Sequence, residues 1–162
     1  RDDAAEAEIG WGIDLITEIR SIRTEMNVPA RTMVQLALIK PSSKTFELAR
    51  AWDSMLNRLA RVSGTISVES PPAGSVQLLI RGEVAALPLK GVIDLAAERS
   101  RLEKEIAKAD ADIMRVDLKL GNENFIANAP EDIVEDEKEK REAAVARKAK
   151  FVEALERLKA AE

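Results

Sequence analysis

The chain has 162 residues, enough for one domain or two small ones, and its 46% hydrophobic and 33% charged residues exclude disorder throughout. It contains no His and no Cys, which excludes zinc sites built from these residues, thiol nucleophiles, Ser–His–Asp triads and disulfides. No apolar run reaches the roughly 18 residues of a membrane span, no signal peptide opens the chain, and the formal net charge of −4 requires a nucleic-acid partner to meet a local basic face.

The composition of the chain changes near residues 89–91. From Val92 onward Gly121 and Pro130 are the only glycine and proline, whereas the preceding residues contain both types throughout. We therefore predict an α+β protein of two domains. Residues 1–91 form a small domain of helices and antiparallel strands, and residues 92–162 form a long antiparallel helical hairpin, a coiled coil.

The small domain begins with a predicted helix over residues 12–26, where isoleucines recur at helical spacing. Pro29 ends this helix, because the residue before a proline avoids the helical region. A short strand over residues 32–39 follows. Near the end of the helix, Arg20 and Arg23 lie one turn apart; they either cap carbonyls or pair with acids, or they contact RNA.

The second predicted helix starts at Ser42 or Ser43 as N-cap and carries an apolar stripe over residues 46–59, until Gly64 stops it. Trp52 on this stripe is expected to be a core ring.

Strands are predicted over residues 65–69 and 76–81, joined by a turn at 71–74. Residues 85–89 add an edge strand, because Pro88 limits its pairing.

The first helix of the hairpin follows a heptad repeat, which makes a partner helix necessary. Positions a and d hold Val92, Leu95, Arg99, Leu102, Ile106, Ala109, Ile113, Val116 and Leu120. Gly121 breaks this helix, and Pro130 suits the first turn of the second helix, over residues 131–158. The second helix has a poorer seam: positions a and d hold Val134, Glu137, Arg141, Ala144, Lys148, Phe151, Leu155 and Leu158.

Reversal of the chain near residues 125–126 predicts which residues face each other across the hairpin. Asp112 then lies against Lys140, and Glu105 lies against Arg147, so both pairs have opposite charges. Each exposed pair contributes roughly 0.2–1 kcal/mol, so these pairs set the register more than the stability.

Charges of one sign gather on the outer positions of the first arm helix. Every charged residue from Ser100 to Leu118 at heptad positions b, c and f is basic, whereas the acids flank the seam. The outer positions of the second helix are rich in Glu. The basic face predicts contact with nucleic-acid phosphates, and the alternative is an ordinary solvated helix face. Arg99 in the seam either reaches RNA or pairs with an acid where the hairpin joins the small domain.

Three segments carry a resemblance to bacterial valyl-tRNA synthetase. IRSIRTEMNVPARTMVQLAL at 19–38 is similar to the end of its anticodon-binding region, and LPLKGVIDLAAERSRLEKEIAK at 87–108 resembles the entry into its C-terminal coiled-coil arm. KLGNENFIANAPEDIVEDEKEK at 119–140 is similar to the tip of that arm. The resemblance, together with a first residue that is Arg1 and not Met, leads us to expect a C-terminal piece of a longer protein.

The resemblance implies a non-catalytic, cytoplasmic, monomeric module whose arm binds the outer corner of tRNA and positions it for aminoacylation. Signatures of the HIGH and KMSKS type are absent, so the chain should be inactive alone. It should hold no cofactor, with ATP and Mg bound by the catalytic domain of the parent enzyme, which also selects valine tRNA. No membrane partner is expected, and the alternative is a coiled-coil protein-interaction module that does not bind RNA. The candidate tRNA-binding residues are Arg99, Arg101, Lys104, Lys108 and Arg115.

Overall fold

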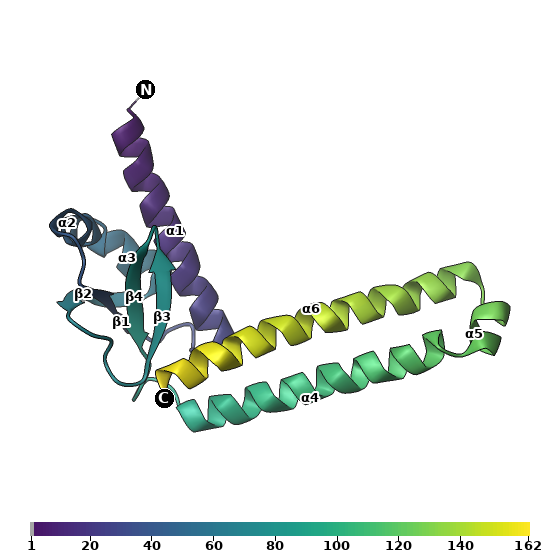
Figure 1. Ribbon diagram of the computed structural model, residues 1–162. Coiled ribbons are helices and arrows are strands. Elements are labelled where there is room, and N and C mark those ends of the chain that lie inside the picture. The colour runs from purple at the N-terminus through teal and green to yellow at the C-terminus, as the bar shows by residue number, and fades with distance from the viewer. Residues whose placement is uncertain (1) are drawn as a thin grey trace. The chain divides into compact units, whose positions relative to one another are not determined.

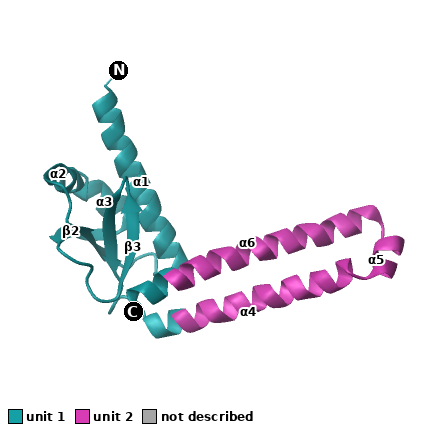
Figure 2. Cartoon of the chain, viewed as in Figure 1, with its two compact units in different colours: residues 1–98, 157–162 teal, residues 99–156 magenta. Residues whose placement is uncertain are grey.

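The computed structural model describes residues 2–162, which divide into two compact units. The first unit runs to Glu98 and includes Arg157–Glu162, and the second unit is Arg99–Glu156 (Figure 2). Within the described residues, no helix combines the length and the apolar character needed to cross a membrane.

The first helix of unit 1, α1, spans Asp3–Glu25 and so starts earlier than the predicted residue 12. Its N-cap is Asp2, whose carboxylate accepts a hydrogen bond from the amide of Ala5 at 3.1 Å. The buried face carries Leu15, Ile19 and Ile22, all with no exposed surface. The sequence prediction missed the first turns because they are rich in Ala and acids and bury little apolar surface.

The predicted second helix is two helices, α2 (Ser43–Ala51) and α3 (Asp53–Ala60), which meet at Trp52. Ser42 is the N-cap of α2 and accepts a hydrogen bond from the amide of Thr45. The ring of Trp52 packs over Gly12 so closely that a Cβ there would lie 2.4 Å from it. The apolar stripe continues through the break, so the spacing of apolar residues predicts one helix where there are two. The predicted stop at Gly64 is wrong, because α3 ends at Ala60.

Four strands form one sheet in the order β2-β1-β4-β3 (Figure 1). Their bounds are Val34–Ile39 for β1, Val62–Val68 for β2, Ser75–Ile80 for β3 and Glu83–Pro88 for β4. The strands β1 and β2 are parallel, because α2 and α3 carry the chain between them, and the other neighbours are antiparallel. The α+β class is confirmed, whereas the prediction of antiparallel strands is wrong for β1 and β2.

The prediction that residues 85–89 form an edge strand is wrong, because β4 lies between β1 and β3. Pro88 is compatible with this central place because it is the last residue of β4, opposite Ser75 at the start of β3, while β1 pairs only with residues 84–86.

The hairpin consists of α4 (Leu95–Leu120) and α6 (Glu131–Ala161), joined through the short helix α5 (Glu123–Asn128) (Figure 1). Asp94 caps α4 by accepting a hydrogen bond from the amide of Ala97. Within unit 2 the predicted d positions are buried on α4 at Leu102, Ala109 and Val116, and on α6 at Glu137 and Ala144. The predicted helical hairpin and the d seam of α4 are therefore confirmed. On α6 the predicted d position Phe151 is half-buried, and Ala154, at a predicted g position, is buried instead.

The predicted register of the hairpin is wrong by about one heptad. Lys140 pairs with Glu137 on its own helix and not with Asp112, and Glu105 pairs with Lys108 and not with Arg147. Asp112 instead contacts Arg147 at 3.0 Å. The reason is the turn: α5 adds ordered residues, so the chain reverses closer to Pro130 than to residues 125–126.

Candidate nucleic-acid interface

All five predicted binding residues lie on α4, within unit 2. Lys108 and Arg115 are the most exposed where the structure gives values, with 74% and 67% of their side chains accessible. Lys104 is also exposed and forms no ion pair within residues 2–162. Arg101 is half-buried. Arg99 lies 3.4 Å from Glu103, one turn along the same helix.

Three of the acids that flank the seam on α4 pair with basic side chains of α6. These ion pairs cross the hairpin, so they help to fix its register. Their cations lie along the seam of α6. The pairs are Asp110–Lys148 at 2.7 Å, Asp112–Arg147 at 3.0 Å and Asp117–Arg141 at 2.6 Å.

This arrangement leaves the outer face of α4 basic, although Asp110 and Asp112 lie next to it in sequence. Both carboxylates point toward α6 cations, and Asp112 is shared between Arg147 and Arg115. Lys108 has a pair with Glu105 at 3.4 Å, a long contact between exposed groups that phosphate could replace. We name the face formed by Lys104, Lys108 and Arg115 the α4 basic face.

A buried carboxylate lies in the seam at Glu137, at a position where a coiled coil usually has an apolar residue. Lys140 donates a hydrogen bond to Glu137 at 3.2 Å and Lys119 of α4 donates one at 3.4 Å. The bond from Lys140, followed by that from Lys119, lowers the pKa of Glu137 below its usual value, although desolvation opposes this.

The lowered pKa of Glu137 makes hairpin stability dependent on pH. A carboxyl with a depressed pKa in the folded state stabilises the protein above its unfolded pKa, and this contribution is lost as the pH falls through the folded pKa. We expect the melting temperature of wild type to fall between about pH 7 and pH 3 by more than that of Glu137→Gln. Thermal melts followed by circular dichroism check this, and equal falls in both proteins would contradict it.

The distal part of the hairpin exposes apolar side chains beside the basic ones. Met114 and Leu118 on α4 and Ile126 on α5 are all exposed. Asn122 holds the start of α5 by accepting hydrogen bonds from the amides of Asn124 and Phe125. A surface of this kind can pack against the sugars or base planes of RNA while the neighbouring cations bind phosphates.

Comparisons with known proteins identify the same segment. Residues 94–159 match the family model described as the valyl tRNA synthetase tRNA binding arm. Over its full length the chain is 66% identical to a valine–tRNA ligase of Nitrobacter winogradskyi, of which it covers 17%. Valine–tRNA ligases of Bradyrhizobium diazoefficiens and Agrobacterium fabrum are 62% and 43% identical, over 99% and 87% of the chain and 17% and 15% of the relatives.

The chain thus spans about one sixth of the length of the curated relatives that it matches. The matches to these relatives cover both units, whereas the family model covers α4, α5 and most of α6. The hairpin geometry and these matches agree, and the chain belongs to the valyl-tRNA synthetase family.

Proposed function

We propose that this chain is a non-catalytic tRNA-binding module, and that the α4 basic face contacts the tRNA. The observation that carries the proposal is the separation of charge on α4. Asp110, Asp112 and Asp117 pair with cations of α6. Lys104, Lys108 and Arg115 lie at the outer positions, where Lys108 and Arg115 also contact Glu105 and Asp112 of their own helix. Phosphates attract Lys and Arg without regard to sequence, and the family model that matches residues 94–159 is named for tRNA binding.

In this proposal the module supplies binding energy at a place remote from the aminoacylated end of the tRNA. Contact with the outer corner of the tRNA, where the D and T loops meet, limits the orientations that the molecule can adopt on the enzyme. The reaction, ATP and Mg belong to a catalytic domain outside this chain. Selection of valine tRNA also belongs to the whole enzyme, because phosphate contacts carry no sequence information.

We further propose that the module acts as a monomer in the cytoplasm. The outer face of α4 carries charges at the heptad positions where a second coiled coil would pack, which supports RNA rather than another helix as the occupant. Measurement of molar mass in solution tests this, and a stable dimer through the hairpin would favour the protein-interaction alternative.

The test of tRNA binding is a titration of the chain with valine tRNA at increasing salt. Three phosphate contacts predict that log K falls linearly with log salt concentration, with a slope of about −2 to −3. A control RNA with the same number of phosphates and no folded corner should bind more weakly, because it lacks the shape of the corner. Absent binding, or binding that is independent of salt, would contradict the proposal.

A further inference from the structure

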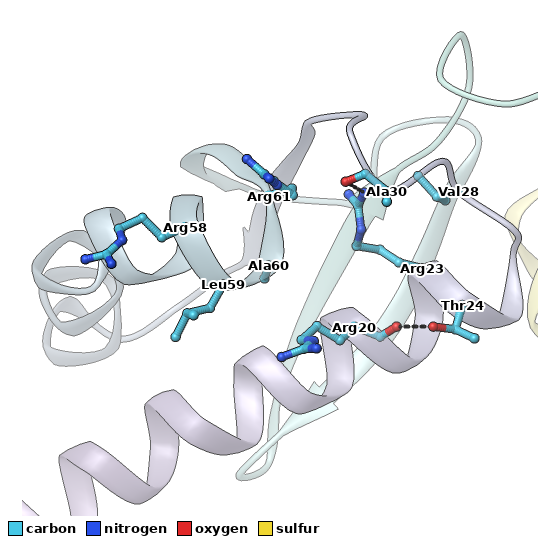
Figure 3. A pocket seen from close by; sticks show the side chains of 9 residues that line it. All are labelled: Arg20, Arg23, Thr24, Val28, Ala30, Arg58, Leu59, Ala60 and Arg61. Carbon is cyan, nitrogen blue, oxygen red and sulfur yellow. Dashed lines mark hydrogen bonds between the residues drawn. The ribbon is translucent and has the colours of Figure 1, made fainter.

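A second basic site lies in unit 1, in a pocket of about 470 Å³ at the end of α1. It is lined by the last turns of α1, the loop that follows, and the end of α3 (Figure 3). Four of the residues that line the pocket are arginines: Arg20, Arg23, Arg58 and Arg61. None of the lining residues is acidic. Within residues 2–162 none of the four arginines forms an ion pair, so their charges are not neutralised by the protein.

Arg23 is the buried member of this cluster, with 7% of its surface exposed. Its Nη2 donates a hydrogen bond to the carbonyl of Pro29 at 2.9 Å and another to that of Ala30 at 3.4 Å. Figure 3 shows the contact with Ala30, and together the two bonds fix the guanidinium in place. Its Nη1 is buried and has no hydrogen-bond partner. A buried donor without a partner is costly, so an acceptor that reached this nitrogen would stabilise the bound state.

Arg61 brings a second charge to the pocket. It is the C-cap of α3 in the left-handed conformation, with φ at 54°, and its carbonyl accepts a hydrogen bond from the amide of Val34 at 2.9 Å. Burial, and after it the charge of Arg61, lowers the pKa of Arg23. Two guanidinium groups held close enough to repel each other attract an anion that can bridge them.

Arg20 and Arg58 lie on the two helices that flank the pocket, each three positions before Arg23 or Arg61. Arg58 also borders a neighbouring recess with Asp53, whose carboxylate pairs with Arg50 at 3.3 Å. The alternative to a binding site is that these arginines only stabilise helix dipoles, as cations at helix C-termini do. That role explains charges near the ends of α1 and α3, but it leaves Arg23 Nη1 without an acceptor.

We propose that this pocket, formed by Arg20, Arg23, Arg58 and Arg61, binds a phosphate group. Guanidinium groups bind phosphate through paired hydrogen bonds in a fixed plane, and the positive charge of the pocket suits an oxyanion. The phosphate comes either from an RNA backbone or from free phosphate in solution. The RNA source rests on the proposed tRNA binding, whereas the site itself does not.

The first experiment is a titration of the chain with inorganic phosphate, followed by amide chemical shifts in NMR at constant ionic strength. We expect saturable shifts at residues 20–30 and 58–61, with chloride giving none. The double variant Arg20→Gln/Arg61→Asn should lose these shifts, because it removes two of the four charges. It should stay folded, because Asn tolerates the left-handed conformation and Arg23 keeps its carbonyl contacts. The matched control Lys44→Gln/Arg81→Gln removes two charges elsewhere in unit 1 and should keep them. Shifts that never saturate, or that survive in the double variant, would overturn the site.

The second experiment separates the two sources by measuring tRNA affinity against salt. If the phosphate belongs to RNA, Arg20→Gln/Arg61→Asn reduces the salt slope by about one and weakens binding by roughly tenfold, while Lys44→Gln/Arg81→Gln has little effect. Unchanged tRNA affinity together with saturable phosphate shifts would overturn the RNA source and leave the site for free phosphate. Failure of the α4 basic face shows separately, as an unchanged affinity after substitutions on α4.

Discussion

Reversal of three charges on the α4 basic face is expected to reduce tRNA affinity by roughly two orders of magnitude. The variant is Lys104→Glu/Lys108→Glu/Arg115→Glu, which turns three phosphate contacts into three repulsions. These side chains are exposed, so the hairpin should stay folded with the same helical circular dichroism.

The control for this variant reverses three exposed lysines of α6, Lys138, Lys150 and Lys159. The change in net charge is the same, so the contribution of net charge to long-range repulsion is matched. We expect the control to weaken binding far less at physiological salt, because charges beyond about 8 Å are screened there. Equal losses from both variants would mean that net charge, and not the α4 basic face, governs binding.

The second large effect concerns the seam of the hairpin. Val116→Asp places a charge at a d position that is 6% exposed. We expect a cost of about 2–4 kcal/mol and loss of most of the hairpin's helical signal on mild heating.

The matched control is Leu118→Asp, two residues along the same helix, where the side chain is 72% exposed. This variant introduces the same charge with the same helix propensity and should melt close to wild type. Circular dichroism melts of the two variants give the comparison. If Val116→Asp and Leu118→Asp have the same melting temperature, the seam is assigned to the wrong face.

The sequence predicts those parts of the fold that depend on local spacing. The d seam of α4 follows from heptad spacing alone, and the C-terminal end of α1 follows from Pro29. The register of the hairpin does not follow from spacing, because it depends on how many residues the turn orders. A shift of one heptad keeps every a and d residue in the seam and changes only the ion pairs, which differ by little energy.

The remaining errors in unit 1 arise from contacts between residues distant in sequence. The break at Trp52 depends on its packing over Gly12, and the central place of β4 depends on pairing with both β1 and β3. The arginine pocket is a similar case. Arg20 and Arg23 stand out on α1, but Arg58 and Arg61 join them only through the packing of α3 against α1. For Arg58 and Arg61, the one signal in the sequence is their spacing of three residues at the end of a helix.

The most direct measurement of the central claim is the reactivity of lysines toward an acetylating reagent, with and without bound valine tRNA, read residue by residue in mass spectra. Lysines in contact with phosphates lose reactivity, and exposed lysines away from the RNA keep it. The proposed function predicts that tRNA protects Lys104 and Lys108 on α4 and leaves Lys138 and Lys150 on α6 reactive. Protection of the α6 lysines with full reactivity of Lys104 and Lys108 would contradict it.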